Sequence, residues 1–295
     1  MSVPDTAQAF WVTRPGHGAI QSEPLPAMGQ NDVRVRALYS GVSRGTESLV
    51  FHGRVPSSET QRMRAPFQVG EFPGPVKYGY CSVGRVTHGP QALVDQTVFC
   101  LHPHQDRYIV PATMVVPVPA DVPAYRAVLA ANMETAINGV WDANPMLGER
   151  VCVVGGGVVG ALVAYLCARI AGVQVQLIDI NGEREALADA LGVPFALPEQ
   201  APADQDCVIH ASGHPEGLRL AMSLVGQLPA KLQPRWNYQR RLALALRLLA
   251  DPTLDVLISG ESNFMDLPAL APALFGPGSK ALCHRIRYPV QDEPE

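Results

Sequence analysis

The feature that most constrains the fold of this chain is a glycine-rich turn that follows a short apolar run. Residues 151–160 read Val-Cys-Val-Val-Gly-Gly-Gly-Val-Val-Gly, so the glycines at 155, 157 and 160 have the spacing G-x-G-x-x-G. The run before them predicts a buried strand, and the run after them predicts a helix. Gly155 permits a tight turn, Gly157 lets the backbone approach a diphosphate, and Gly160 lets the helix pack closely on the strand. The sequence therefore predicts a βαβ unit that binds a dinucleotide.

An acidic residue follows the next apolar run at the place where such a unit needs one. Asp179 stands nineteen residues after Gly160, at the end of the predicted strand 173–178. Its carboxylate is expected to accept hydrogen bonds from the adenosine ribose hydroxyls. The amides of Val158 and Val159, together with the positive end of the helix dipole, are expected to hold the phosphates.

Two further positions bear on the ligand. Ser212 and Gly213 follow the predicted strand 207–211 and are expected to contact the cofactor, although an ordinary strand-to-helix turn is the alternative.

Asp179 repels a 2′-phosphate, so the sequence favours NAD(H) as the cofactor, while Arg184 keeps NADP(H) open. A purely structural glycine turn and a site for S-adenosylmethionine are the two other interpretations.

The rest of the chain divides into a β-rich half and an α/β half. Gly and Pro separate β-rich runs that predict strands at 33–37, 81–86, 97–101, 108–110 and 114–118. After Pro123 helical spacing covers 125–141, and the predicted elements then alternate: strands 151–154, 173–178 and 207–211 with helices 157–171, 183–191 and 215–224. Helices are also expected at 240–249 and 267–275, and strands at 254–259 and 281–288. This order predicts the α/β class, with a β-rich domain and a doubly wound parallel sheet.

Length, charge and cysteine usage limit the classes of function. A chain of 295 residues is long enough for two domains. A formal net charge of −4 without long like-charge runs is no footprint for nucleic acid or an anionic membrane. The six cysteines contain no C-x-x-C pair, and the first ten residues lack a basic segment followed by an apolar core. We therefore expect a cytoplasmic protein that acts on a small molecule.

Several segments together resemble the medium-chain dehydrogenase/reductase superfamily, in which a GroES-like domain is joined to a Rossmann domain. The resemblance covers most of the chain and lies in the glycine turn and in residues 41–47 (GVSRGTE), 79–86 (GYCSVGRV), 134–136 (ETA) and 177–181 (LIDIN). The first two of these resemble the subgroup that includes the bacteriochlorophyllide hydroxyethyl dehydrogenases, in type and not in substrate. The resemblance implies hydride transfer between nicotinamide and an alcohol/carbonyl or an enone/quinone.

The positions that hold catalytic zinc in the zinc-dependent members carry other residues here. Those members have a Cys in the first segment and Gly-His-Glu in the second, whereas this chain has Ser43 and Gly79-Tyr80-Cys81. The third ligand would fall near Ala131 or Asn132, neither of which binds zinc. The resemblance thus implies an enzyme without zinc, similar to the zinc-free quinone and enone reductases.

Without zinc, a carbonyl or enone needs hydrogen-bond donors and a proton source. Tyr80 is the first candidate donor, and Ser43, Thr46 and Glu47 are expected on the same wall of the pocket. The alternative is that Tyr80 is a half-buried packing residue and that Glu47 caps or pairs locally.

Two histidines stand near each other in the second half of the β-rich region. His102 and His104 share one face if the segment is extended, which is a spacing found in metal sites. The Pro between them and the lack of a third ligand favour a polar contact in the substrate pocket. A solvated loop is the remaining alternative.

The resemblance implies a GroES-like catalytic domain over residues 1–122, a Rossmann domain over 123–260 and a return to the catalytic domain over 261–295. It departs from the superfamily after residue 226, where about two strands that would extend the sheet and form the usual dimer edge have no counterpart. A homodimer is the assembly that the relatives suggest. The departure also leaves open a non-catalytic nucleotide-binding protein with a degenerate dehydrogenase fold.

Overall fold

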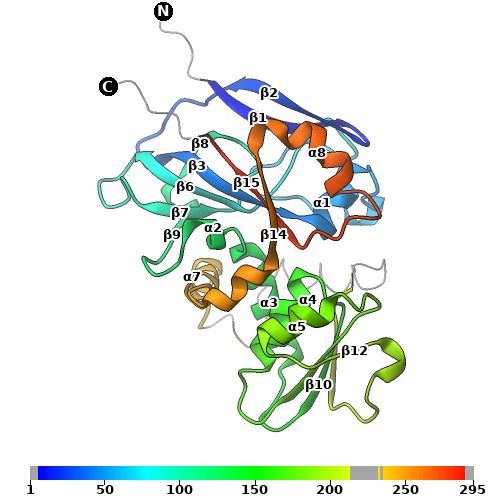
Figure 1. Ribbon diagram of the computed structural model, residues 1–295. Helices are drawn as coiled ribbons and strands as arrows, with labels where there is room; N and C mark the ends of the chain where they lie inside the picture. The colour runs from blue at the N-terminus through cyan, green and yellow to red at the C-terminus, as the bar shows by residue number, and fades with distance from the viewer. Residues whose placement is uncertain (1–5, 213–231, 233–234, 290–295) are drawn as a thin grey trace, which may run out of the picture. The chain divides into compact units, whose positions relative to one another are not determined.

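The computed structural model describes residues 6–212, 232 and 235–289, which form two compact units. The first comprises Met1–Ala130 and Ile258–Glu295, and the second comprises Ala131–Leu257 (Figure 1). The sequence analysis placed these boundaries at 122/123 and 260/261. Helix α2 (Ala124–Ala127) packs against the first unit's sheet, and strand β14 (Ile258–Asn263) pairs within that sheet, so both elements belong to the first unit.

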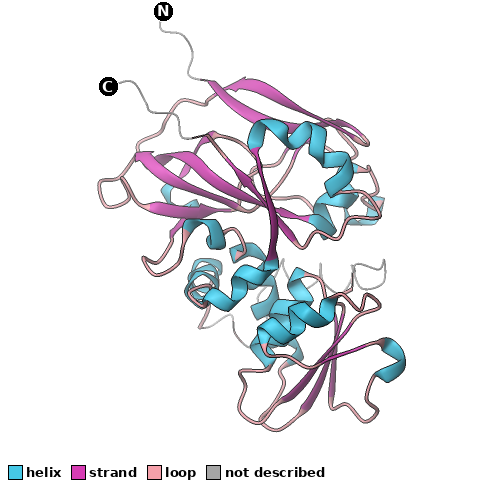
Figure 2. Ribbon diagram, in the orientation of Figure 1, coloured by secondary structure: helices cyan, strands magenta, loops and turns pink. Residues whose placement is uncertain are grey.

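Two sheets, mostly antiparallel, make up the first unit (Figures 1 and 2). One sheet has the order β2-β1-β5-β4, and the other has the order β14-β15-β3-β6-β7-β9 with β8 also paired to β3. The remaining strands of this unit are β1 Thr6–Arg14, β2 His17–Pro24, β3 Asp32–Ser43, β4 Val69–Gly70, β5 Val76–Lys77, β6 Ser82–His88, β7 Thr97–Cys100, β8 Arg107–Pro111, β9 Val115–Pro117 and β15 Cys283–Arg287. Its other helices are α1 Arg44–Phe51 and α8 Leu267–Leu274.

Alternation along β3 explains how the larger sheet forms its core. Val33, Val35 and Ala37 are buried, while the residues between them are only partly covered. Successive side chains of a strand point to opposite faces, so one face of β3 is apolar. Valines and Tyr108 from β6, β7, β8 and β9 complete the cluster. Each such buried apolar side chain contributes about 1.5–3 kcal/mol to stability.

The hairpin of β1 and β2 and helix α1 were not among the predicted elements. Strand β1 buries Ala7, Ala9, Phe10 and Val12, and because Ala9 and Phe10 are adjacent, its buried positions do not alternate strictly along the sequence. Strand β2 has no fully buried residue, and its side chains give no periodic pattern. Tertiary pairing, rather than local preference, makes these strands.

A parallel sheet of order β12-β11-β10-β13 forms the centre of the second unit. Its strands are β10 Arg150–Val154, β11 Gln174–Ile178, β12 Phe195–Ala196 and β13 Cys207–His210. Helices α4 Val158–Cys167 and α5 Arg184–Leu191 pack on this sheet (Figure 1), and α3 Ala130–Ala143 and α7 Tyr238–Leu248 complete the described helices. The order of strands and helices confirms the predicted α/β class.

The structure differs from the prediction at the end of helix α4, at residues 254–259 and at strand β12. Helix α4 ends at Cys167 instead of 171, because the chain tightens into short turns and then bends at Gly172, whose φ is +75°. The predicted strand 254–259 begins instead as a 3₁₀ turn, Pro252–Leu257, after which β14 runs from Ile258 to Asn263. The two-residue strand β12 was missed, because so short a run carries no periodicity.

A buried ion pair joins α3 to α7 inside the second unit. Nε of Arg241 donates to Oε1 of Glu134 at 3.0 Å, and a terminal guanidinium nitrogen donates to the side-chain oxygen of Asn138 at 2.6 Å. Both charged side chains are almost fully covered. Burial raises the pKa of Glu134, and the adjacent guanidinium opposes that rise.

Within the described ranges, no helix has both the length and the apolar character needed to span a membrane. The predicted helix 215–224 and the departure after residue 226 lie outside the described residues. The proposed loss of two strands therefore stays a prediction.

Candidate functional site

The glycine turn of the second unit is built as its sequence predicts. Gly155 has a φ of +111°, a backbone conformation that side chains rarely adopt, and its amide donates to the carbonyl of Ile178 at 2.7 Å. A Cβ at this position would lie 2.6 Å from the amide nitrogen of Ser212. Only glycine fits here, because the turn brings the ends of β10 and β13 into close contact.

Gly157 and Gly160 differ in what surrounds them. A Cβ on Gly160 would lie 1.8 Å from the carbonyl oxygen of Gly155, so this glycine allows α4 to pack directly on the turn. A Cβ on Gly157 would meet nothing within 4 Å, and this exposed residue is the N-cap of α4. Amides in the first turn of a helix, such as those of Val158 and Val159, have no partner within the helix. Open space therefore lies beside amides that are suited to an anion.

Asp179 lies directly against this turn. Its Oδ2 accepts the amide of Gly156 at 2.5 Å, and its Oδ1 accepts the amide of Asn181 at 2.8 Å. Each carboxylate oxygen keeps further lone pairs, since an ionised carboxylate offers about four acceptor positions. The structure thus brings together the bend and the acid that sequence spacing paired, and the ribose-binding role of Asp179 stays a prediction.

The stem of the Arg184 side chain approaches the same turn as Asp179. The Cγ of Arg184 lies 3.2 Å from the position that a Cβ on Gly156 would take, and Oδ2 of Asp179 lies at the same distance from that position. Ser212, whose hydroxyl lies 2.8 Å from Nε2 of His210, closes the other side of the turn. Gly213, predicted beside it, lies outside the described residues.

A second polar site lies in the first unit, where β3 ends and α1 begins. The Ser43 amide donates to Oε1 of Glu47 at 2.7 Å, and Oε2 of Glu47 lies 2.8 Å from Nε2 of His104. Glu47 and His104 are both buried. Glu47 therefore does pair locally, as the alternative interpretation held, but it also reaches a histidine that stands 57 residues away.

Tyr80 borders the same group of side chains. It is partly buried, and its phenol hydrogen-bonds with the side chains of Ser43 and Thr46. Burial raises the pKa of Tyr80 well above its ordinary value, while those two hydrogen bonds hold it lower and the Glu47 carboxylate raises it further. The structure brings together the four predicted residues Tyr80, Ser43, Thr46 and Glu47. Their catalytic role stays a prediction.

His102 is buried, so the solvated-loop interpretation is wrong for it and for His104. Its ring stacks on Tyr108 with centroids 3.8 Å apart, and its Nδ1 lies 3.0 Å from the Pro103 carbonyl. Burial lowers the pKa of His102 to about 3, so the ring is neutral at ordinary pH. The described parts of the chain hold no group of three or more His, Cys, Asp or Glu side chains arranged to bind a metal ion.

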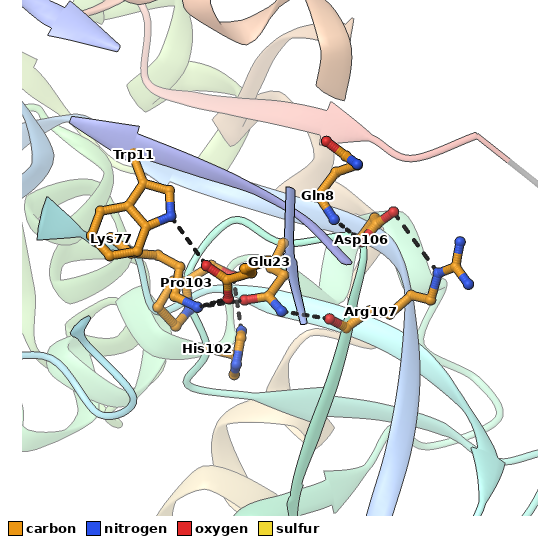
Figure 3. Close-up of polar contacts among 9 residues, drawn as sticks. Gln8, Trp11, Glu23, Lys77, His102, Pro103, Asp106 and Arg107 are labelled. Carbon is orange, nitrogen blue, oxygen red and sulfur yellow. Dashed lines mark hydrogen bonds and ion pairs between the residues drawn. The ribbon is translucent and has the colours of Figure 1, made fainter. Parts of the chain in front are cut away.

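Close to His102, a charged network that the sequence did not indicate ties β1 and β2 to β5 (Figure 3). Lys77 is buried and pairs with Glu23, and it also donates to the side-chain oxygen of Gln105 at 2.8 Å. The indole nitrogen of Trp11 donates to the second oxygen of Glu23 at 3.2 Å. Because this lysine and carboxylate are paired, the network holds the small sheet against the segment that carries the two histidines.

Two hydroxyl groups at the buried end of the second site were also missed. Ser40 lies 2.7 Å from Nδ1 of His104 and 3.0 Å from the phenol oxygen of Tyr288. Ser40 precedes the recognised segment by one residue, and Tyr288 follows β15 near the other end of the chain. No local pattern connects residues separated by 248 positions.

Comparison with known proteins gives distant relatives and a clear structural likeness. No family model matches the chain. L-threonine 3-dehydrogenase of Edwardsiella ictaluri is 23% identical over 231 residues, which cover 70% of this chain and 67% of that protein. L-idonate 5-dehydrogenase of Escherichia coli superposes with a TM-score of 0.75 at 16% identity, over 97% of this chain and 99% of that one.

Two further solved structures hold nicotinamide cofactors. A Sinorhizobium meliloti protein described as a zinc-binding dehydrogenase and bound to NADP superposes with a TM-score of 0.72 at 16% identity, over 96% of this chain and 99% of that one. An alcohol dehydrogenase of Escherichia coli in complex with NADH superposes with a TM-score of 0.71 at 17% identity, with the same shares of both chains. The architecture is therefore that of these dehydrogenases, with a β domain and a parallel Rossmann sheet.

Proposed function

We propose that this chain is an NAD(P)-dependent dehydrogenase of the medium-chain superfamily, and that it moves hydride between nicotinamide and an alcohol/carbonyl or enone/quinone substrate without catalytic zinc. The observation that carries the proposal is the turn at Gly155–Gly160, with its open side at Gly157 and with Asp179 against it. The distant relatives named above are dehydrogenases of small molecules, which supports the reaction class.

The residues of the turn fit the dinucleotide. The amides of Val158 and Val159 would face its diphosphate, and the lone pairs left on Asp179 would accept its ribose hydroxyls. When bound, the nicotinamide ring supplies or accepts the hydride. Everything else that the reaction needs, orientation of the substrate and a place for the proton, falls to the side chains of this protein.

NAD(H) is the cofactor that Asp179 favours. A carboxylate beside the ribose repels the 2′-phosphate that distinguishes NADP(H), and both of its oxygens are fixed by backbone amides and cannot turn away. The Arg184 side chain approaches the turn at Gly156, and its positive charge is the feature that would weaken this discrimination. We therefore expect tighter binding of NADH than of NADPH, with a moderate difference.

Zinc independence is supported by the donor set and not by the emptiness of any site. Ser43 and Tyr80 stand where the zinc-dependent members have a Cys and a His, and neither is a usual ligand of zinc. Both instead offer hydroxyl groups, and they are hydrogen-bonded to each other. Hydroxyl groups can polarise a carbonyl oxygen through hydrogen bonds. In the zinc-dependent members the metal ion performs this task.

Tyr80 is the proposed proton donor to the substrate oxygen. Its raised pKa keeps the phenol protonated at ordinary pH, so it donates a hydrogen bond to a carbonyl and gives up its proton only as negative charge develops there. Ser43 and Thr46 hold the phenol in place through their hydrogen bonds. Glu47 orients this wall, and the two histidines, His102 and His104, are the proposed polar contacts of the substrate pocket.

The test combines binding with turnover. Calorimetry with NADH, NADPH and S-adenosylmethionine identifies the ligand, and NADH absorbance is then followed with a panel of quinones, enones, ketones and alcohols. We expect NADH binding and turnover with at least one class, without stimulation by added zinc. General acid–base groups contribute about 10²–10⁴-fold, so Tyr80→Phe is expected to lower kcat within that range.

Tyr78, two residues before Tyr80, offers a matched control for the Tyr80→Phe variant. Tyr78 also carries a buried phenol, which donates to the Met63 carbonyl at 2.8 Å, so Tyr78→Phe removes a similar hydroxyl and should keep kcat. NADH binding without turnover across the panel would favour the alternative of a non-catalytic nucleotide-binding protein. Binding of S-adenosylmethionine in place of NADH would overturn the proposal altogether.

The expected homodimer and the expected cytoplasmic location of the protein both stay predictions.

A further inference from the structure

Four hydrogen-bonded side chains form a continuous row through the interior of the first unit. The Tyr288 phenol lies 3.0 Å from Oγ of Ser40, which lies 2.7 Å from Nδ1 of His104, and Nε2 of His104 lies 2.8 Å from Oε2 of Glu47. All four side chains are buried. Two of them, Ser40 and Tyr288, have no part in the function proposed above.

The chemistry of the four groups fixes the direction in which each hydrogen bond is donated. An ionised carboxylate only accepts, so the ring proton of His104 must sit on Nε2 and point to Glu47. The Nδ1 of a neutral ring then accepts, and Ser40 is its donor. The hydroxyl oxygen of Ser40 in turn accepts from Tyr288, whose own oxygen receives the backbone amide of Gln105. Every proton in the row therefore has one acceptor.

The opposite tautomer leaves this arrangement unsatisfied. A proton on Nδ1 would force Ser40 to accept from His104 and to donate to Tyr288, whose oxygen already receives the Gln105 amide. Nε2 would then face the Glu47 carboxylate as two acceptors 2.8 Å apart. Buried groups without a partner cost about 1–3 kcal/mol each, so the row selects the Nε2–H form.

The backbone holds both ends of the row in place. Tyr288 follows β15, which pairs with β3 so that Ile286 stands opposite Ser40. The amide of Tyr288 itself donates to the Leu38 carbonyl at 3.1 Å. Gly79, with a φ of +130°, covers the imidazole: a Cβ there would lie 3.0 Å from Cδ2 of His104. The ring thus has little room to rotate away from its two partners.

We propose that Ser40 and Tyr288 are positioning residues of the dehydrogenase: they hold His104 as the Nε2–H tautomer, and His104 in turn fixes the Glu47 carboxylate against the wall formed by Ser43 and Tyr80. The inference rests on the proposed function for its catalytic consequence. The carboxylate so held is one of the groups that raise the pKa of the Tyr80 phenol, after burial as the main cause. Neither Ser40 nor Tyr288 needs to touch the substrate to act in this way.

The first readout is the tautomer itself. In protein with ¹⁵N-labelled histidine, with the His104 signals assigned by their loss in His104→Gln, we expect a protonated Nε2 and an unprotonated Nδ1. Ser40→Ala removes the donor to Nδ1 while Glu47 still accepts from Nε2, so this variant should shift the pattern towards a doubly protonated ring, and Tyr288→Phe should do so to a smaller extent. A wild-type ring protonated on Nδ1, or a pattern that Ser40→Ala leaves unchanged, overturns the inference.

The unit contains a matched control for the loss of a buried hydroxyl. Ser82 lies 3.0 Å from the phenol of Tyr108, so Ser82→Ala breaks a buried Ser–Tyr hydrogen bond of the same length without touching His104. This variant is expected to keep the His104 pattern and the wild-type kcat. NADH binding reports on the second unit only, so thermal unfolding by circular dichroism is used in every variant to show that the first unit is folded.

The second readout is steady-state kinetics with the substrate found in the panel. Ser40→Ala and Tyr288→Phe should lower kcat roughly 10-fold, part of what a general acid–base group contributes, and should leave the KM for NADH unchanged. An unchanged kcat alongside a changed tautomer overturns the catalytic consequence. A wild-type protein that shows the expected tautomer and binds NADH but turns over nothing refutes the proposed function, while the tautomer assignment stands.

Discussion

The contact between Gly160 and the carbonyl of Gly155 allows a quantitative test of the glycine turn. In Gly160→Ala the new Cβ would lie 1.8 Å from that oxygen, more than 1 Å short of the 3.0 Å below which real Cβ contacts do not occur. The carbonyl oxygen of Gly155 belongs to the backbone, so α4 must move away from β10 to relieve the clash. Forcing one methyl group into a packed contact costs about 2 kcal/mol.

Two measurable losses should follow from this movement. A cost of about 2 kcal/mol corresponds to a thermal midpoint roughly 6 °C lower for a domain of this size. Displacement of the α4 amides also weakens hydrogen bonds to the diphosphate, and a charge-assisted bond contributes about 1.5–3 kcal/mol. We expect the Kd for NADH to rise at least about 10-fold, since each 1.4 kcal/mol is one factor of ten. Thermal unfolding by circular dichroism and calorimetry with NADH measure the two effects.

Two further glycine-to-alanine variants separate stability from binding. At Gly157 the new methyl group meets nothing within 4 Å, so the thermal midpoint should change little, whereas the affinity for NADH should fall because the methyl group occupies the place of the diphosphate. Gly278→Ala, also in open space but in the first unit, should change neither quantity. A Gly160→Ala protein with the wild-type midpoint and the wild-type affinity would refute the role assigned to this turn.

Two other predictions concern stability of the second unit. Glu134→Ala leaves the guanidinium of Arg241 buried without its carboxylate and should lower the free energy of unfolding by about 3–5 kcal/mol. The double variant Glu134→Ala with Arg241→Met should recover most of that loss. Urea titration measures both proteins, and a loss below about 1 kcal/mol in the single variant would contradict the prediction. Asp251 has its pKa lowered to about 2, first by the hydrogen bond from Tyr165, which donates at 2.6 Å, and then by Thr253. The stabilisation that ionised Asp251 gives the fold is therefore complete above the ordinary pKa of an aspartate and disappears as pH falls towards 2. The free energies of unfolding of wild type and Asp251→Asn should differ at pH 6 and converge near pH 2. A difference between them that does not depend on pH would argue against this role.

The parts of the fold that the sequence predicted are those encoded locally. One continuous segment, from Val151 to Asp179, contains the strand, the glycine turn, the helix and the acidic residue. The spacing of its glycines predicted the positions at which the structure has no room for a Cβ, such as Gly155 and Gly160. The first part of β3 was predicted from the β-rich run at 33–37, whereas its continuation to Ser43 was not. Helix ends were less predictable, because α4 stops where tertiary turns intervene and not where its apolar residues end.

The site in the first unit could be predicted only in part. Ser43, Thr46 and Glu47 were predicted on one wall because they stand in the single segment 41–47 that resembles the superfamily, and in the structure α1 carries two of them directly after β3. His104 was a candidate, but its partnership with Glu47 required the pairing of distant strands. Tyr288 gave no indication at all, since its contact with Ser40 depends on β15 reaching β3 from the other end of the chain.

The same pairing of β15 with β3 determines the order in which the protein can be completed during synthesis. The second unit is one uninterrupted stretch, Ala131–Leu257, whereas the first unit needs both Met1–Ala130 and Ile258–Glu295. Domains fold as units while the chain emerges from the ribosome. The second unit can therefore finish first, and the N-terminal sheet waits with an open edge along β3 until residues 283–287 arrive. A nascent chain of this protein thus carries a finished Rossmann domain beside an unfinished β domain.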